Sequence, residues 1–388
     1  MPGARRRARL TVYTTDVLII GGGLAGCATA CHLAASGVET TLVERGGLNR
    51  AASGTNAGSM HFQLRRHDQI SPARGQLIRG GLAEWRSIGE EFGPAIGMRM
   101  DGGLMVAETP DELTRLHAKI KTERELGLTS EVLQGRELAD LAPALATDLA
   151  GATFCPEEGL VNPLLATGAF ASAARGHGAD IRTGCEVSAV DVIDSGGFIV
   201  HTRTGPLRAS RVVNAAGAWA GQIARLAGVP IPLTGGVQMV SATARQPPVL
   251  TQLVQHVARA LTLKQTMDGT FLVGGGWSGA VPRGGPRPSW ESLAGNAFLA
   301  CRVVPGLRAA TLLRSWTGTI AMTPDRLPVA GESARLPGWF SLVAPRGAAG
   351  YTVTPYLARL LASDLANGGD GGSAMPSVFS PDRWSADG

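Results

Sequence analysis

The sequence predicts an α/β domain with a parallel sheet, into which an α+β domain with an antiparallel sheet is inserted. Two observations predict this arrangement. Near its beginning, short apolar runs flank a glycine-rich turn and a helix, as in a β-α-β unit. Residues 230–276 instead have strand character interrupted by Pro and Gly, without alternating helices. The 388 residues are enough for two to three domains of about 150 residues each.

The first unit is the clearest local pattern. Residues 16–20 form an apolar, β-branched run that suits a strand buried on both faces. Residues 24–36 carry Ala, Leu and small side chains at helical spacing and stop at Gly37, a typical residue after a helix. Residues 39–43 then form a second strand. Such a unit is expected to be parallel and right-handed.

Later elements alternate less regularly. We expect helices at 72–92, 110–126, 163–176 and 354–367, strands at 104–107, 180–182 and 186–193, and a hairpin from 197–202 and 207–214. The first domain is then discontinuous, at 14–85, 150–222 and 312–370. The second comprises 86–149 and 223–311, and the tails are 1–13 and 371–388.

The glycine-rich turn has the Gly-X-Gly-X-X-Gly spacing, with Gly21, Gly23 and Gly26 between strand and helix. These glycines suit a tight turn, close approach of a diphosphate and helix–strand packing. Glu44 follows at the end of the second strand, where a carboxylate accepts the hydroxyls of an adenosine ribose and disfavours a 2′-phosphate. The pattern predicts a dinucleotide site; the alternative is a purely structural turn.

Composition narrows the class of protein further. Aromatic residues are only 5% and form no aromatic–basic cluster, so we expect no nucleic-acid partner. The net charge is +5, and a short leader supplies four positive charges, from Arg5, Arg6, Arg7 and Arg9. The rest of the chain is therefore close to neutral. No apolar run is long enough for a signal sequence or a membrane span. The five cysteines suit neither a disulfide scaffold nor a metal site, so we expect a cytoplasmic protein without a bound metal.

Four further segments carry a resemblance to a known family. They are residues 158–163, a strand and small-residue turn at 211–220, the block 314–331, and residues 347–351 with the helix that follows. In this order they resemble the FAD-dependent oxidases of the D-amino-acid oxidase, glycine oxidase and sarcosine oxidase superfamily, across residues 14–384. Residues 269–277 are similar to the branch of opine oxidases and hydroxyproline dehydrogenase β subunits.

The resemblance implies a Rossmann-like FAD-binding domain with an inserted substrate domain, the glutathione-reductase-2-type fold. It also implies FAD as cofactor, and we expect no covalent bond to it because no Cys lies near the last flavin loop. The segment 53–63 corresponds to the loop beneath the flavin. The implied FAD-binding residues are Gly21, Gly23, Leu24, Ala25, Gly26, Glu44, Arg45, Ser53, Thr55, Asn56, Ala57, Gly58, Ser59, Val187, Ala215, Ala216, Gly217, Trp219, Arg346, Gly347, Ala348, Gly350, Tyr351 and Thr352.

Three residues are candidates for the chemistry itself. Arg314 aligns with the position that binds the substrate carboxylate in the family, and the alternative is an ordinary ion pair. His61 either takes a proton from the substrate amine or is a structural histidine. Tyr351 is expected to form part of the wall. Among the implied FAD-binding residues, Arg346 either stabilises negative charge on the reduced ring or lies at the surface.

The expected reaction is oxidation of a small amino acid or secondary amine, such as glycine, sarcosine, a D-amino acid, a proline or an opine. Hydride transfer to FAD gives an imine, which hydrolyses to a 2-oxo acid. Either O₂ or a partner subunit accepts the electrons. The alternatives are a 2-hydroxy-acid dehydrogenase, an aromatic hydroxylase, and a flavoprotein subunit that is active only in a hetero-oligomer.

Overall fold

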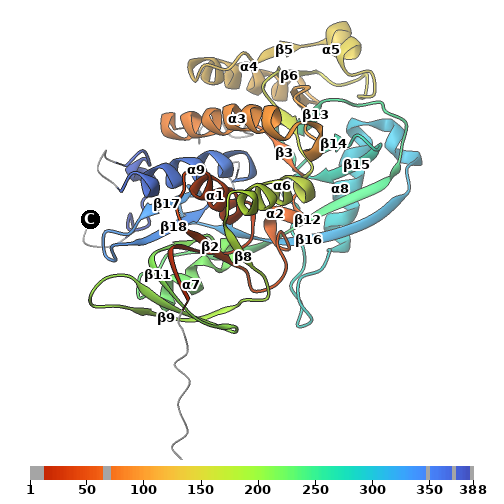
Figure 1. Ribbon diagram of the computed structural model, residues 1–388. Helices are drawn as coiled ribbons and strands as arrows, with labels where there is room; N and C mark the ends of the chain where they lie inside the picture. Colours follow the sequence, from red (N-terminus) through yellow and green to blue (C-terminus); the bar gives the residue numbers. More distant parts are fainter. Residues whose placement is uncertain (1–12, 64–70, 347–349, 369–372, 385–388) are drawn as a thin grey trace, which may run out of the picture.

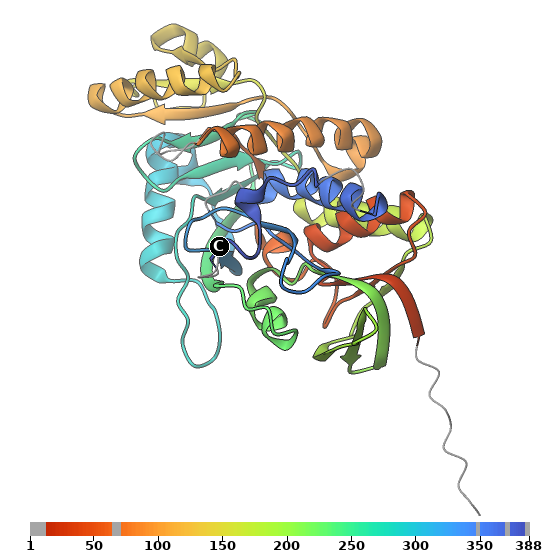
Figure 2. The ribbon, with the colours of Figure 1, turned by 90° about the vertical axis from the view of Figure 1, so that its left-hand side faces the viewer.

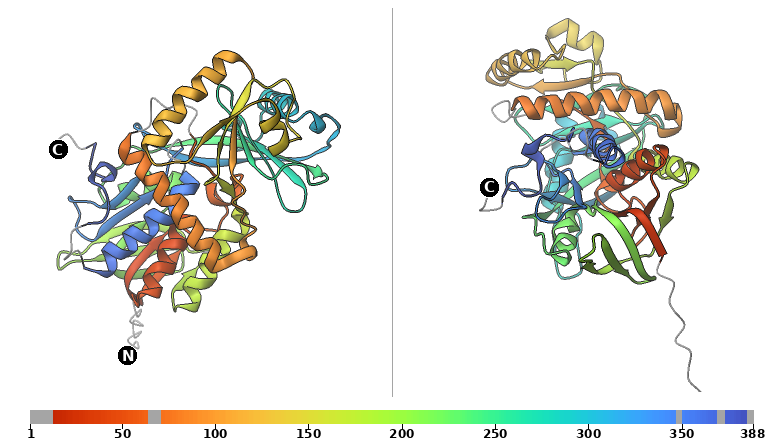
Figure 3. Two further views of the ribbon diagram at one scale, coloured as in Figure 1. Left: turned by 90° about the horizontal axis from the view of Figure 1, so that it is seen from above. Right: turned by 60° about the vertical axis from the view of Figure 1, so that its left-hand side comes forward.

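The computed structural model describes residues 13–63, 71–346, 350–368 and 373–384. Within these residues the chain forms two large sheets, each covered by helices (Figure 1). Seen from above, the two sheets lie side by side (Figure 3). The arginine-rich leader falls outside the described residues.

The first sheet is built around β1 (Tyr13–Ile20), which lies between β11 (Gly205–Asn214) and β2 (Thr40–Val43). β1 is parallel to both neighbours, as the β-α-β unit predicted. Further parallel strands extend the sheet on either side: β18 (Trp339–Val343) and β8 (Asp180–Arg182). The antiparallel members are β9 (Val187–Val192), β10 (Phe198–Thr202) and β17 (Val329–Glu332). The predicted hairpin is thus β10 and β11.

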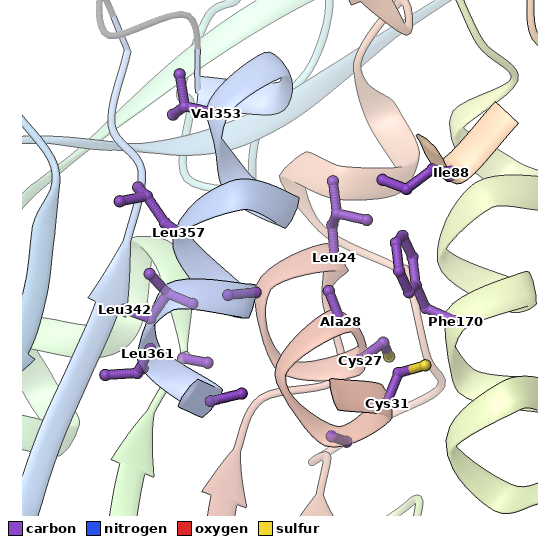
Figure 4. Close-up of a cluster of buried hydrophobic side chains, with 14 of the residues drawn as sticks. Leu24, Cys27, Ala28, Cys31, Ile88, Phe170, Leu342, Val353, Leu357 and Leu361 are labelled. Carbon is purple, nitrogen blue, oxygen red and sulfur yellow. The ribbon is translucent and has the colours of Figure 1, made fainter. Parts of the chain in front are cut away.

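Helices with small or apolar faces cover one side of this sheet. α1 (Leu24–Ala35) packs between α6 (Pro163–Gly176) and α9 (Gly350–Ala366), and α3 (Pro72–Phe92) packs on α9. Figure 4 shows Ala28 of α1 in the cluster that also contains Phe170 and Leu357. Burying each of these two large side chains contributes roughly 1.5–3 kcal/mol.

The second sheet is almost entirely antiparallel. Its strands, in spatial order, are β16 (Leu312–Met322), β12 (Thr234–Arg245), β15 (Thr270–Gly274), β14 (Thr262–Gln265), β13 (Leu253–His256), β4 (Gly103–Ala107), β6 (Gly151–Cys155) and β5 (Glu131–Leu133). Only the pairing of β13 with β4 is parallel among these described strands. The strand-rich block at 230–276 therefore forms an antiparallel sheet, as expected.

Helices also cover the second sheet. They are α4 (Pro110–Glu125), α5 (Gly135–Leu141) and α8 (Trp290–Val303). In Figure 2, α3 lies between α9 and the layer that contains α4. The shorter elements are α2 (Ala52–Thr55), β3 (Ser59–Met60), β7 (Gly159–Leu160), α7 (Ala220–Leu226) and the 3₁₀ turns Gly93–Ile96, Gly217–Trp219, Pro305–Ala309 and Ser377–Phe379.

The structure departs from the sequence-based boundaries in three places. β6 and β16 lie in segments assigned to the first domain, yet they join the second sheet, because β6 pairs with β4 and β16 pairs along its length with β12. α8 was not predicted, although Ser289 caps its N-terminus. Residues 373–384, expected as part of a tail, pack against the first sheet through buried Phe379.

Among the described residues, no helix combines the length and the apolar character that crossing a membrane requires.

Candidate active site

A cavity of about 1780 Å³ opens at the carboxyl ends of the parallel strands β1, β2, β11 and β18, and residues of the second sheet complete its wall. Ligands of α/β proteins bind at this edge of the sheet. The volume exceeds the roughly 300–1,000 Å³ of an ordinary small-molecule pocket, so the cavity has room for a large cofactor and a substrate.

Most of the residues predicted to bind the cofactor line this cavity. The structure brings together Gly21, Gly23, Leu24, Ala25, Glu44, Arg45, Ser53, Thr55, Asn56, Ala57, Ser59, Val187, Ala215, Ala216, Gly217, Trp219, Arg346, Gly350 and Tyr351, with His61 beside them. Gly347 and Ala348 lie outside the described residues.

The glycine turn has the geometry that its sequence predicted. Gly21 has φ of 119°, which favours glycine, and a β-carbon there would lie 2.5 Å from the carbonyl oxygen of Ala215. A β-carbon on Gly26 would lie 1.9 Å from the carbonyl oxygen of Gly21. Gly26 therefore shapes the turn from behind and does not line the cavity, which corrects its assignment as a contact residue.

Glu44 follows β2 and closes the turn from the other side. Its Oε2 accepts a hydrogen bond from the Gly22 N–H at 2.8 Å, and its Oε1 accepts one from the Gly46 N–H at 2.9 Å. The carboxylate thus holds the two loops in place, while it also lines the cavity. Arg45 places its guanidinium 4.0 Å from the ring centroid of Trp219, and this pair forms one wall.

The polar side chains of α2 and of the loop after it hydrogen-bond to backbone groups of α1 and of their own segment. Ser53 Oγ accepts from the Leu24 N–H at 2.9 Å, and Asn56 Oδ1 accepts from the Gly58 N–H at 2.6 Å. The Trp316 indole donates to the Thr55 carbonyl at 2.8 Å. Sequence analysis expected Ser53, Thr55 and Asn56 to bind the cofactor directly. Their side chains hydrogen-bond within the protein, and all three residues line the cavity.

Two further residues expected at the cofactor stand behind the wall. A β-carbon on Gly58 would lie 2.0 Å from the carbonyl oxygen of Val161, so this glycine is needed for packing. Thr352 is fully buried, and its hydroxyl accepts from the His61 N–H at 3.2 Å. Both residues position the loop that carries His61, and neither lines the cavity.

Tyr351 lies where α9 begins at the cavity. Its ring stacks on Trp85, with centroids 5.4 Å apart and planes at 16°. Pro355 has no N–H to donate to the Tyr351 carbonyl one turn earlier in the helix. The Trp85 indole N–H donates to that carbonyl instead, at 3.4 Å. The Tyr351 hydroxyl is buried without a hydrogen-bond partner among the described residues, and burial raises its pKa. It is therefore a protonated donor that lacks an acceptor.

Arg314, the predicted carboxylate-binding residue, is not at the cavity. It is exposed near the beginning of β16, opposite Ala242 of β12, whereas the cavity is lined by residues 317–322 of the same strand. The expectation is therefore wrong in its position along the strand. Trp277 and Trp316 also lie outside the lining; the Trp277 indole donates to the Ala260 carbonyl at 2.6 Å.

Five other arginines line the cavity, among them Arg74 on α3, Arg326 after β16 and Arg346 after β18; the remaining two are Arg50 and Arg115. Arg326 has φ of 61°, which is uncommon outside glycine. With the Gln238 side-chain oxygen turned toward it, Arg346 donates to that oxygen from Nε at 2.7 Å. Neither Arg74 nor Arg326 was predicted from the sequence to lie at the site. The turn 323–327 that presents Arg326 lies within the block that carried the family resemblance.

The residues present fit a dinucleotide. The turn ahead of α1 is a cradle without side chains, because β-carbons at Gly21, Gly22 and Gly26 would fill it or strike its wall. The N-terminus of α1 points its positive dipole toward this cradle, which suits a diphosphate. Tyr351 also lines the cavity, and its buried hydroxyl lacks a hydrogen-bond partner among the described residues.

Comparison with known proteins agrees with this geometry. Residues 16–363 match the family described as DAO, FAD dependent oxidoreductase. In sequence, the chain is 36% identical to a subunit of the anaerobic glycerol-3-phosphate dehydrogenase of Haloferax volcanii over 56% of this chain and 38% of the relative. It is 28% identical to mitochondrial sarcosine dehydrogenase of Mus musculus over 84% of this chain and 37% of the relative. The chain thus spans under two fifths of the length of these curated relatives.

Two further similarities span nearly the whole chain. An opine oxidase subunit of Agrobacterium tumefaciens is 26% identical over 92% of this chain and 95% of its own length. The crystal structure of glycine oxidase from Geobacillus kaustophilus superposes with a TM-score of 0.83, at 26% identity over 96% of this chain and 99% of that chain. The predicted fold class and the family resemblance are confirmed.

Proposed function

Because the chain belongs to the DAO family of FAD-dependent oxidoreductases, we propose that it oxidises the carbon–nitrogen bond of a small amino acid or secondary amine. Candidate substrates are glycine, sarcosine, D-amino acids, proline and opines. FAD, when bound, accepts the hydride from the carbon next to nitrogen, and the resulting imine hydrolyses to a 2-oxo acid and an amine. The observation that carries the proposal is a cavity with an FAD cradle at one part of its wall and guanidinium groups at another.

Arg346 is the group we assign to the substrate carboxylate. A planar guanidinium binds two carboxylate oxygens at once. Gln238 and the Gly276 carbonyl, which accepts from Arg346 Nη2 at 3.3 Å, hold the guanidinium from one side. The backbone N–H of Arg346 donates to the Ala321 carbonyl at 2.9 Å, so the β18 loop is fixed against β16. These contacts orient the side chain before substrate arrives.

The other residues have positioning roles in this proposal. The Tyr351 hydroxyl donates to the substrate or the cofactor, and Trp85 keeps the ring in place. His61 lines the cavity and either accepts a proton from the substrate amine or only shapes the wall. Glu44 and the turn at 21–25 hold the ribose and diphosphate of FAD.

A second candidate is oxidation of a hydroxyl compound that carries an acidic group. The relationship to the glycerol-3-phosphate dehydrogenase subunit favours it, and the same guanidinium groups suit a phosphate or a 2-hydroxy acid. The relationship to the opine oxidase subunit supports a third arrangement, in which a partner protein accepts the electrons in place of O₂.

The five cysteines are free, which supports a reducing, cytoplasmic location.

The test is anaerobic mixing of the purified flavoprotein with two substrate panels. Bleaching of the oxidised flavin by glycine, sarcosine, D-alanine or proline supports amine oxidation. Bleaching by glycerol 3-phosphate or lactate, with no response to any amine, would replace it by the second candidate. Acid precipitation tests the bond to FAD: yellow colour in the supernatant is expected, and colour that stays in the pellet contradicts non-covalent binding.

A further inference from the structure

We propose that the cavity selects a substrate with two acidic groups, and that Arg326 binds the second group. This inference rests on the proposed function and makes its substrate class more specific. It concerns a place in the cavity that is separate from the Arg346 guanidinium.

Two of the arginines that line the cavity, Arg346 and Arg326, belong to different loops. Arg346 belongs to the loop after β18 and is held by Gln238 and Gly276. Arg326 belongs to the turn after β16, where its backbone N–H donates to the Thr323 carbonyl at 3.3 Å. Because the two arginines belong to different loops, each presents its own set of guanidinium donors. One carboxylate bound bidentately by Arg346 leaves the donors of Arg326 unused.

The turn that presents Arg326 is built in a sparsely populated conformation. Arg326 has φ of 61°, and its neighbours close the turn, since Thr323 Oγ1 donates to the Leu327 carbonyl at 3.0 Å. A residue other than glycine keeps this conformation only where its surroundings impose it. Such a conformation is found most often where a side chain must be aimed at a ligand.

The nearby arginines repel each other. The charge of Arg326 lowers the pKa of Arg346, after a larger effect of burial, and it lowers the pKa of Arg74 in the same way. Arg74 is almost fully buried at the start of α3. Arg326 itself is exposed, and positive charges that lie near one another favour the binding of anionic groups.

Acidic side chains of the described wall do not supply that anion. The acidic residues of the lining are Glu44 and Glu186, and Glu44 is bonded to the glycine turn. Asp325, the chain neighbour of Arg326, is bound by Arg383, whose Nε and Nη2 lie 2.7 and 3.2 Å from its two carboxylate oxygens. Asp325 is thus already paired, and an acidic group of a ligand can approach Arg326 from the cavity.

The test compares two pairs of ligands that differ by one carboxylate. Oxydiacetate and methoxyacetate have an ether oxygen in place of the amine, so calorimetry of the FAD-loaded protein measures binding without turnover. Iminodiacetate and sarcosine are the corresponding amines for anaerobic flavin reduction. We expect oxydiacetate to bind about 100-fold more tightly than methoxyacetate, within the range of measured charge-pair couplings. The same preference is expected in kcat/KM for the two amines.

Variants assign the effect to Arg326. Arg326→Gln should remove most of the difference between the two ether ligands, and Arg326→Lys should keep part of it. Arg314→Gln, a substitution of an exposed arginine outside the cavity, should leave the difference unchanged. Equal affinities for oxydiacetate and methoxyacetate in the unmodified protein, or an undiminished difference in Arg326→Gln, overturns the inference.

Three further outcomes distinguish a phosphate ligand from a dicarboxylate, and distinguish failure of the Arg326 site from failure of the proposed function. Tight binding of glycerol 3-phosphate that exceeds that of oxydiacetate, and that is lost in Arg326→Gln, overturns the dicarboxylate in favour of a phosphate. Preferential oxydiacetate binding without reduction by any amine supports the subsite and contradicts the proposed function. Reduction by sarcosine and iminodiacetate at equal kcat/KM supports the function and contradicts the subsite.

Discussion

The α-carbon of Gly26 lies so close to Gly21 that a β-carbon on it would stand 1.9 Å from the Gly21 carbonyl oxygen. This contact lets α1 begin directly beneath the turn at the end of β1. The turn and the helix N-terminus therefore form one unit, and its shape depends on the absence of a side chain at position 26.

Gly26→Ala should damage both stability and cofactor binding. Relief of the clash requires a shift of the turn or of α1, which costs on the order of 3 kcal/mol. We expect a lower Tm and little bound FAD after purification. The matched control is Gly168→Ala, at an exposed position inside α6 with nothing near its added carbon, which should keep FAD and gain up to about 1 kcal/mol. Full FAD content in Gly26→Ala would contradict the role of this contact.

Glu158 should make stability depend on pH. It is fully buried beneath the His61 loop and accepts hydrogen bonds from the N–H groups of Phe62 and Gln63, both at 2.6 Å. Burial raises its pKa from 4.5 to about 7, against the smaller effects of these bonds and of Lys119. The neutral carboxyl is thus favoured in the folded state. Its contribution to stability is complete below pH 4.5 and is lost as the pH rises through 7, by about 3 kcal/mol at most.

The control for this effect is Glu158→Gln, which cannot ionise. Denaturant unfolding between pH 4.5 and 8 should show that the parent protein loses stability relative to the variant as the pH rises. Lys119 and its ion-pair partner Glu123, 2.6 Å apart, remain in both proteins, so the comparison isolates the carboxyl of Glu158. A constant difference across this range would mean that Glu158 does not titrate there.

Arg383→Ala should weaken dianion binding from a distance. Arg383 forms an ion pair with Asp325. Removal of the Arg383 side chain leaves the Asp325 carboxylate unpaired next to Arg326 in the chain. We expect the Kd of oxydiacetate to rise about tenfold, which corresponds to 1.4 kcal/mol. The double variant Arg383→Ala with Asp325→Asn should recover most of this affinity, because Asn can still accept the Leu327 N–H that Asp325 Oδ1 accepts at 3.0 Å. Affinity that stays low in the double variant would point to collapse of the turn instead.

Tyr351→Phe should separate stability from activity. The buried hydroxyl lacks a partner among the described residues, and an unsatisfied hydroxyl costs about 1–3 kcal/mol. The variant keeps the ring that stacks on Trp85, so its Tm should be unchanged or higher. The kcat/KM for the amine should fall about tenfold if the hydroxyl donates to the ligand. A large loss of Tm would show that the hydroxyl has a structural partner.

Local sequence patterns were sufficient for the parts of the site that lie next to each other in the chain. The glycine turn and Glu44 were predicted because one β-α-β unit places both at the carboxyl ends of adjacent strands. Arg346 was predicted through the family resemblance of the loop that follows β18. These residues need no knowledge of the second sheet.

The positions of Arg326 and Arg74 at the cavity could not be predicted from local sequence patterns. Arg314 and Arg326 flank the same segment of sequence, but only pairing of β16 with β12 decides which part of that segment faces the cavity. Arg74 reaches the wall because α3 packs on α9, with Gly80 against the Tyr356 ring and Arg359 bonded to Glu84. Contacts of this kind join elements nearly 300 residues apart and leave no local pattern.

The most direct test of amine oxidation is anaerobic stopped-flow mixing of the FAD-loaded protein with iminodiacetate and with sarcosine. We expect iminodiacetate to bleach the oxidised flavin, with sarcosine slower at equal concentration, and with the advantage of iminodiacetate lost in Arg326→Gln. A flavin that stays oxidised with every amine, while glycerol 3-phosphate or lactate reduces it, would contradict the account.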